Sequence, residues 1–229
     1  MTLALGIWMA LVYVPLTVLL LFHYLRDKTP KRLHLLLAFT AASIGFIANL
    51  VEELLALGGY MFGASLAFKL FDIFEMAGVF MFFVFLTDFV QYQKRYIGLS
   101  YAALLLVIFA IALSPLELVK QGSALVEVRY IWAAGIGIIA YWLTHFGVIS
   151  YEFWRYSKLI EERLPRARMQ LIALGGLYAV LAYLAVIILK SAFPDQLPFT
   201  EIVGAVFAVV AGILFYLGAE TPNWLKSIL

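Results

Sequence analysis

Seven long apolar runs constrain the fold of this chain more than any other feature of its sequence. A helix needs roughly 20 apolar residues to cross a hydrocarbon core about 30 Å thick, and the runs are close to this length or exceed it. The shortest run ends at Ser114-Pro115, because proline cannot continue the helical hydrogen-bond ladder. The runs predict an all-α, seven-helix transmembrane bundle that forms one domain, 1–229, with helices at approximately 3–25, 33–57, 66–92, 97–114, 130–152, 169–192 and 200–219.

Composition supports a membrane protein and removes several classes of chemistry. Hydrophobic residues make up 65% of the 229 residues and charged residues 13%, and the mean hydropathy of +1.00 lies far outside the range of soluble domains. The chain has no cysteine, which excludes disulfides, thiolate nucleophiles and cysteine-ligated metal clusters. It has no His-Glu-x-x-His or Gly-x-Ser-x-Gly motif, no phosphate-binding glycine loop and no basic stripe for nucleic acid. We expect neither enzymatic activity, nor a cofactor, nor a nucleic-acid partner.

The distribution of the sixteen Lys and Arg residues predicts how the bundle lies in the membrane. With the N-terminus outside, twelve of them fall in the cytoplasmic connections and tail, and four fall on the outer side. The positive-inside rule therefore favours a multi-pass protein of the cell membrane with its N-terminus outside and its C-terminus inside. The twelve are Arg26, Lys28, Lys31, Arg32, Lys94, Arg95, Arg155, Lys158, Arg163, Arg166, Arg168 and Lys226, and the four are Lys69, Lys120, Arg129 and Lys190.

Ionisable side chains gather at the predicted outer ends of several helices. A charge at the centre of a transmembrane helix costs about 2.5–3.5 kcal/mol on insertion scales, so each one needs a partner or a wet cavity. In the stretch FKLFDIFEMAG, Lys69, Asp72 and Glu75 are three residues apart and lie on neighbouring turns. We predict an outward-opening polar cavity for a small ligand, a proton or a cation, with a lining that includes Glu52, Glu53, Asp72, Glu75, Lys190 and Glu201.

An interfacial position is a second explanation for some of these groups. Lys69, Lys190 and Glu53 lie near helix ends, where the lysines snorkel to water and the acid is hydrated. Asp72 and Glu75 lie one to two turns further in, where charges are functional by default. Glu75 lies deepest and has no basic residue three or four positions away on its own helix, so its partner is the main open question.

Other polar residues are weaker candidates, and none of them identifies a metal site. His145 either relays a proton or is satisfied by a neighbouring helix. Asp88, at the inner end of the third helix, is expected to pair with a cytoplasmic base such as Arg95. The secondary candidates for the polar site are Asn49, Tyr141, His145 and Tyr183.

The layout resembles four groups of seven-helix proteins. Seven helices with the N-terminus outside resemble the layout of rhodopsins, G-protein-coupled receptors and the sensor modules of some microbial histidine kinases. The sequence TPNWLK after the last helix resembles the exit of such a sensor module into a cytoplasmic segment. Retinal proteins carry a Schiff-base lysine midway along the last helix, and TEIVGAVFAVVAGILFYLG contains no lysine, so retinal is not expected. SWEET-type sugar transporters share a 3+1+3 helix plan, but their Pro-Gln dipeptide is missing here. DKTPKRLHLLLAF is similar to ERLPRARMQLIAL, which permits such a repeat, but the positive-inside rule favours the second explanation, that inward loops collect proline and basic residues in any case.

The sequence leaves three functions open. We expect a receptor-like sensor first, a small proton-coupled transporter with a 3+1+3 repeat second, and a non-catalytic subunit of a membrane complex third. A transporter predicts a polar path to the cytoplasmic side, whereas the inner halves of 33–57, 169–192 and 200–219 are almost wholly apolar. A homo-oligomer is left open. Besides the bilayer, a cytoplasmic protein or anionic lipid is expected to bind the basic residues Arg155, Lys158, Arg163, Arg166 and Arg168.

Overall fold

The computed structural model describes residues 3–121, 125–130, 132–192, 197–222 and 225. It confirms the seven-helix architecture, because seven helices in this part of the chain are long and apolar enough to cross a membrane. They are α1 (Leu3–Arg26), α2 (Pro30–Leu57), α3 (Met61–Thr87), α4 (Ile97–Leu113), α5 (Trp132–Ser157), α6 (Arg163–Ala192) and α7 (Leu197–Glu220).

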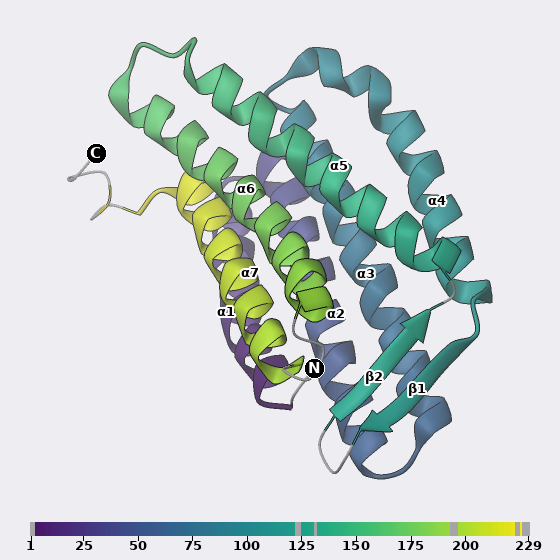
Figure 1. Ribbon diagram of the computed structural model, residues 1–229. Coiled ribbons are helices and arrows are strands. Elements are labelled where there is room, and N and C mark those ends of the chain that lie inside the picture. The colour runs from purple at the N-terminus through teal and green to yellow at the C-terminus, as the bar shows by residue number, and fades with distance from the viewer. Residues whose placement is uncertain (1–2, 122–124, 131, 193–196, 223–224, 226–229) are drawn as a thin grey trace.

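Six of these helices form a closed ring, and α4 packs outside it (Figure 1). Consecutive contacts join α1 to α2, α2 to α3, α5 to α6 and α6 to α7, and α7 returns to α1. The ring closes because α3 also contacts α5 directly, while α4 covers the outer side of that pair. The interior of the bundle is therefore shared by α1, α2, α3, α5, α6 and α7.

Small residues allow the ring to close tightly. A Cβ atom on Gly78 of α3 would lie 3.2 Å from the carbonyl oxygen of Ala38, so α2 and α3 approach each other nearly backbone to backbone. A Cβ atom on Gly218 of α7 would lie 2.8 Å from the carbonyl oxygen of Arg168 on α6. Close packing of this kind drives helix association in lipid, where burial of apolar area gives no net gain.

Several helix boundaries differ from the predicted ones. α3 begins and ends five residues earlier than predicted, because the turn at Gly58-Gly59, where Gly59 has φ 82°, lets the chain restart at Met61. A short 3-10 helix, η1 (Gln91–Tyr96), follows α3. α5 continues to Ser157 and α6 begins at Arg163, so part of the predicted basic loop is helical.

A β-hairpin, which the sequence analysis did not predict, joins α4 to α5. Its strands, β1 (Leu116–Gln121) and β2 (Leu125–Tyr130), pair antiparallel with Leu116 opposite Tyr130 and Gln121 opposite Leu125. The alternating pattern of LVEVRY is the signal for a strand. The hairpin lies against α3 and α5 at the end of the bundle where the chain begins, which we call the hairpin end (Figure 1).

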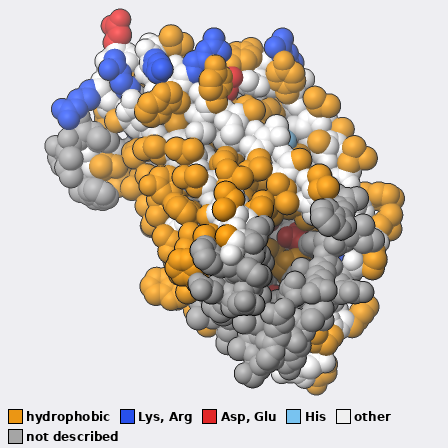
Figure 2. Space-filling view, in the orientation of Figure 1, with side chains coloured by type: hydrophobic (Ala, Val, Ile, Leu, Met, Phe, Trp, Pro, Cys, Tyr) orange, Lys and Arg blue, Asp and Glu red, His pale blue; other side chains and the backbone are white. Residues whose placement is uncertain are grey.

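The opposite end carries the α1–α2, α3–α4 and α5–α6 connections and the end of α7, and we call it the basic end. Figure 2 shows Lys and Arg side chains gathered at this upper end of the molecule, and acidic atoms in a hollow lower on the same face. The basic residues assigned to the predicted cytoplasmic connections thus share one end of the bundle.

Candidate ligand cavity

A cavity of about 370 Å³ occupies the middle of the helix ring. All six helices of the ring contribute lining residues, and α4 contributes none of those described because it lies outside the ring. This volume falls within the range of natural small-molecule sites. The helix packing therefore produces an internal space large enough for a small organic ligand.

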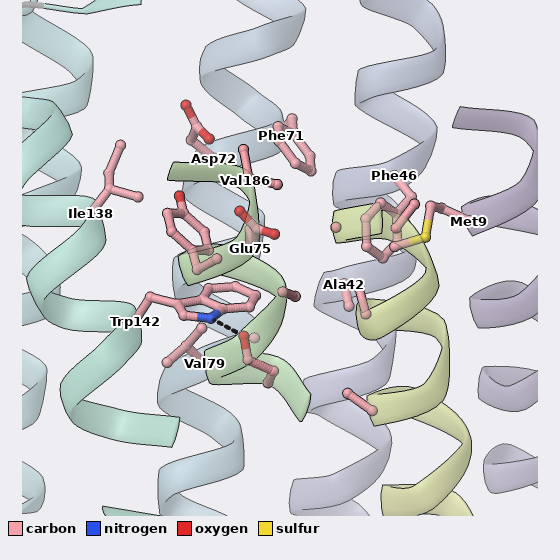
Figure 3. A pocket seen from close by; sticks show the side chains of 18 of the residues that line it. Met9, Ala42, Phe46, Phe71, Asp72, Glu75, Val79, Ile138, Trp142 and Val186 are labelled. Carbon is pink, nitrogen blue, oxygen red and sulfur yellow. Dashed lines mark hydrogen bonds between the residues drawn. The ribbon is translucent and has the colours of Figure 1, made fainter. Parts of the chain in front are cut away.

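Three acidic residues line the cavity: Asp72 and Glu75 of α3, and Glu201 of α7. The three-residue spacing of Asp72 and Glu75 places both on the same face of α3, which the helix turns toward the cavity. Figure 3 shows both carboxylates from α3 above the indole of Trp142. Glu201 lies in the described lining at the start of α7, and Gly204, three residues later, packs against Val186 of α6.

Glu75 differs from the other two acids in its surroundings. Asp72 and Glu201 each interact with another residue. The Glu75 carboxylate accepts no hydrogen bond and forms no ion pair with any residue that the structure describes. Of the described residues, the charged group nearest to it along the chain, Asp72, has the same sign. The sequence left open which group pairs with Glu75. In the described chain its carboxylate faces the cavity and has no protein partner.

Aromatic rings form much of the cavity wall. The Trp142 indole Nε1 donates a hydrogen bond to the Ala179 carbonyl oxygen at 2.9 Å, which fixes the ring beneath Glu75 (Figure 3). The centroids of Trp142 and Tyr183 lie 5.0 Å apart. On the opposite side, Tyr13 packs on Phe46 with centroids 4.7 Å apart and donates its hydroxyl hydrogen to the Ala208 carbonyl oxygen at 2.8 Å. These contacts hold the rings in fixed orientations around the acids.

Three further rings form the floor of the cavity toward the basic end. Phe82, Phe146 and Phe215 come from α3, α5 and α7, and their centroids are separated by 4.5 Å (Phe82 to Phe215), 5.7 Å (Phe82 to Phe146) and 5.9 Å (Phe146 to Phe215). Phe82 follows Glu75 by seven residues, which is roughly 10 Å along the helix. All three side chains are buried. The floor that these described residues make is apolar.

The structure brings together only part of the predicted set. Glu52 and Glu53 are buried near the cavity but are not among its described lining residues, and Glu52 accepts a hydrogen bond from the Asn49 amide at 3.2 Å. The described lining thus does not include these two predicted residues. The side chain of Lys190 lies outside the described part of the chain. The lining does include the secondary candidates Asn49 and Tyr183.

Tyr141 and His145 lie away from the cavity lining, between α5 and α4. A hydrogen bond of 2.7 Å joins His145 Nε2 and the Ser100 hydroxyl, and His145 Nδ1 lies 2.7 Å from the Tyr141 carbonyl oxygen. Both ring nitrogens thus have partners. Of the two interpretations of His145, the structure supports satisfaction by a neighbouring helix.

Asp88 pairs with a basic side chain at the basic end, as predicted, but that side chain is His34 and not the example given, Arg95. His34 Nδ1 lies 2.7 Å from Asp88 Oδ2, since the start of α2 packs beside the end of α3. The Arg95 guanidinium instead lies 4.7 Å from the ring centroid of Tyr96.

An ion cluster at the basic end was missed by the sequence analysis. Arg32 of α2 donates to both carboxylate oxygens of Glu220 on α7, at 2.6 and 3.0 Å, and to Asp27 at 2.6 Å. His23 Nδ1 lies 3.6 Å from Glu220, and the Arg168 guanidinium donates to the Gly218 and Ala219 carbonyl oxygens. We call these contacts the α7 clasp. Arg32 and Glu220 are 188 positions apart, so no local pattern signals the pair.

The part of the chain that the structure describes contains no group of three or more His, Asp or Glu side chains that could hold a metal ion. No protein-family model matches the chain, and no curated protein matches it. The fold and the cavity define the class: the chain is an integral, multi-pass membrane protein of seven helices with an acidic, aromatic-lined cavity inside its helix ring.

Proposed function

We propose that this protein is a receptor-like membrane sensor that binds a small ligand in the central cavity. The observation that carries the proposal is Glu75, a carboxylate that faces a cavity of about 370 Å³ and has no partner among the described residues. A charged group at membrane depth is costly unless something neutralises it, and such groups are functional by default. The protein supplies the cavity and the Glu75 carboxylate, and a bound ligand would fill the cavity and neutralise the carboxylate.

The proposed orientation places the N-terminus and the cavity on the outer side and the C-terminus inside. It rests on the positive-inside rule and on the basic residues that share one end of the bundle. The substitution Glu162→Cys in the α5–α6 connection tests this orientation. Because the natural chain has no cysteine, the new thiol is the one group that a thiol reagent can label. An impermeant thiol reagent should label this cysteine in inside-out vesicles and spare it in right-side-out ones.

α7 provides a route from the cavity to the basic end. Glu201 at its start lines the cavity, and Glu220 at its end belongs to the α7 clasp, roughly 30 Å away along the helix. A ligand that binds one position of α7 better than another shifts the helix between the two, and the clasp then changes its contacts. A cytoplasmic protein or anionic lipid at the basic end would sense that change.

The apolar floor formed by Phe82, Phe146 and Phe215 supports a sensor over a transporter. A proton-coupled transporter needs polar groups along its whole path, and these rings interrupt the path below Glu75. Proton flux in proteoliposomes distinguishes the two functions. Flux that Glu75→Gln abolishes would favour the transporter.

A ligand screen by thermal unfolding tests the proposed function. Four proteins in lipid nanodiscs are screened against ions, pH values and metabolites. They are the wild type, Glu75→Gln, Glu201→Gln and a variant whose cavity is filled. Gly135→Leu fills the cavity, because Gly135 lines it and a Cβ atom there meets nothing within 4 Å. Gly147→Leu is the matched control on the same helix, also in open space but outside the described lining.

At least one condition should raise the unfolding temperature of wild type and Gly147→Leu but not that of Gly135→Leu. If no condition stabilises wild type more than Gly135→Leu and the two glutamine variants, the cavity is not a ligand site and the proposed function is wrong.

A further inference from the structure

We infer that the ligand is a small organic ammonium cation with apolar or aromatic substituents. The inference rests on the proposed function, since it assigns a chemical class to the ligand of the same cavity. Three features of the cavity carry it: the charge of its lining, the chemistry of its walls and its size.

The charge of the lining selects a cation. Asp72, Glu75 and Glu201 are acidic, and the described lining contains no Lys, Arg or His. Glu75 is the decisive group, because none of the described residues donates a hydrogen bond or a positive charge to it. An anionic ligand would add a like charge beside Glu75, and a neutral ligand would leave the carboxylate uncompensated. A ligand with a positive charge near Glu75 removes that cost.

The walls select an organic cation over a metal ion. Calcium and magnesium require six or more oxygen ligands at close range, and no group of three suitable side chains converges among the described residues. Nine of the described lining residues are aromatic, and the faces of Trp, Tyr and Phe rings attract cations whose hydration shell is weak. Glu75 and Trp142 line the same cavity, and the hydrogen bond to Ala179 holds the indole there (Figure 3), so a ligand in the cavity meets both a carboxylate and an aromatic face.

The size of the cavity indicates a ligand larger than a single ion. A space of about 370 Å³ is far larger than a single ion, and most of its wall is apolar. Apolar substituents on the nitrogen fill that space and displace water from Ile138, Val79 and Phe46, which line it. A proton on Glu75 would neutralise the carboxylate but leave the cavity unfilled, and it is the competing explanation that the experiment must separate.

Equilibrium binding of matched probes to the full chain in lipid nanodiscs tests the inference. The probes are benzyltrimethylammonium, choline and 3,3-dimethyl-1-butanol, the last being the uncharged carbon analogue of choline. Potassium and sodium chloride at equal ionic strength are the inorganic controls. Glu75→Gln removes the charge at nearly constant shape, and Glu162→Gln removes an exposed carboxylate at the basic end.

The ammonium probes should bind wild type and Glu162→Gln alike and should bind Glu75→Gln at least about tenfold more weakly, which corresponds to about 1.4 kcal/mol. Choline should bind wild type at least about tenfold more tightly than its uncharged analogue, and this comparison needs no variant to fold. Equal binding of choline and the analogue, or binding that is indifferent to Glu75→Gln, would overturn the ammonium assignment.

The two proposals fail in different ways. If the ammonium probes do not bind but another compound stabilises wild type and not Gly135→Leu, the ligand class is wrong and the cavity remains a ligand site. If low pH alone stabilises wild type and no ammonium binds, Glu75 takes up a proton and the ligand class is again wrong. If no condition distinguishes wild type from Gly135→Leu, both proposals fall.

Discussion

Breaking the α7 clasp at Arg32 should destabilise the bundle more than any other single loss of charge at the basic end. Arg32 makes two short hydrogen bonds to Glu220, whose side chain is only 6% exposed, while the Arg32 side chain is 26% exposed. Removing one member of a buried ion pair costs about 3–5 kcal/mol, because the remaining charge is left uncompensated. Partial exposure of Arg32 and the nearby His23 lower this cost. For Arg32→Gln we expect a loss of about 2–3 kcal/mol in the free energy of unfolding.

The two partners are not equivalent. Glu220→Gln leaves Arg32 bonded to Asp27, and the new amide oxygen can still accept a hydrogen bond, so we expect a loss of only about 1 kcal/mol. The double variant should lose less than the sum of the single losses, with a coupling energy of about 1 kcal/mol or more.

Reversible unfolding of the purified variants, followed by circular dichroism, measures these losses. Arg166→Gln is the matched control, since the Arg166 side chain is exposed and donates hydrogen bonds to the backbone oxygens of Ile160 and Glu161. It should stay within about 0.5 kcal/mol of wild type. If Arg32→Gln behaves like Arg166→Gln, or if the double variant shows no coupling, the clasp does not stabilise the end of α7.

Three further predictions concern packing, and the same unfolding measurement checks each. Gly218→Ala should cost about 1–3 kcal/mol because its Cβ atom would lie 2.8 Å from a backbone oxygen of α6, whereas Gly98→Ala, in open space on α4, should gain about 0.5–1 kcal/mol. His145→Leu should cost about 1–3 kcal/mol, because it leaves the buried Ser100 hydroxyl without that partner, and should leave ligand binding in the cavity unchanged. Phe215→Ala should cost about 3–5 kcal/mol by opening the cavity floor, and a smaller loss would show that the floor rearranges.

The sequence predicted the helices well because each depends on a local property. Twenty apolar residues in a row can satisfy their backbone groups in lipid only as a helix, whatever the rest of the chain does. The basic connections between helices are also a local feature of the sequence, and the structure places them together at one end of the bundle. The boundaries were less accurate, since the turn at Gly58-Gly59 ends α2 and lets α3 begin five residues earlier than its most apolar stretch.

The composition of the cavity lining was predicted only in part, because helix rotation and ring closure are tertiary properties. Spacing alone indicates that Asp72 and Glu75 share one face of α3, and both side chains line the cavity. From the sequence, Glu52 was as good a candidate for the lining as Asp72 and Glu75. In the structure it accepts a hydrogen bond from Asn49 and is not in the described lining.

The aromatic wall could not have been predicted from the sequence. Trp142 meets Tyr183 across 41 positions of the chain, and the Phe82, Phe146 and Phe215 floor joins three helices. An apolar segment rich in aromatic residues has the same pattern whether it faces lipid or the bundle. The order in which the ring closes, with α4 outside, decides which aromatic residues face inward.

The most direct test of the central claim, that Glu75 makes the cavity a site for cations, uses the absence of cysteine from the natural chain. A single cysteine at Ala205, which lines the cavity, is reacted with trimethylammonioethyl and sulfonatoethyl methanethiosulfonate. Both rates are normalised to those of a free thiol. The cationic reagent should react at least about tenfold faster, and Glu75→Gln should remove most of that preference. Equal rates for the two reagents, or a preference that Glu75→Gln leaves intact, would contradict the claim.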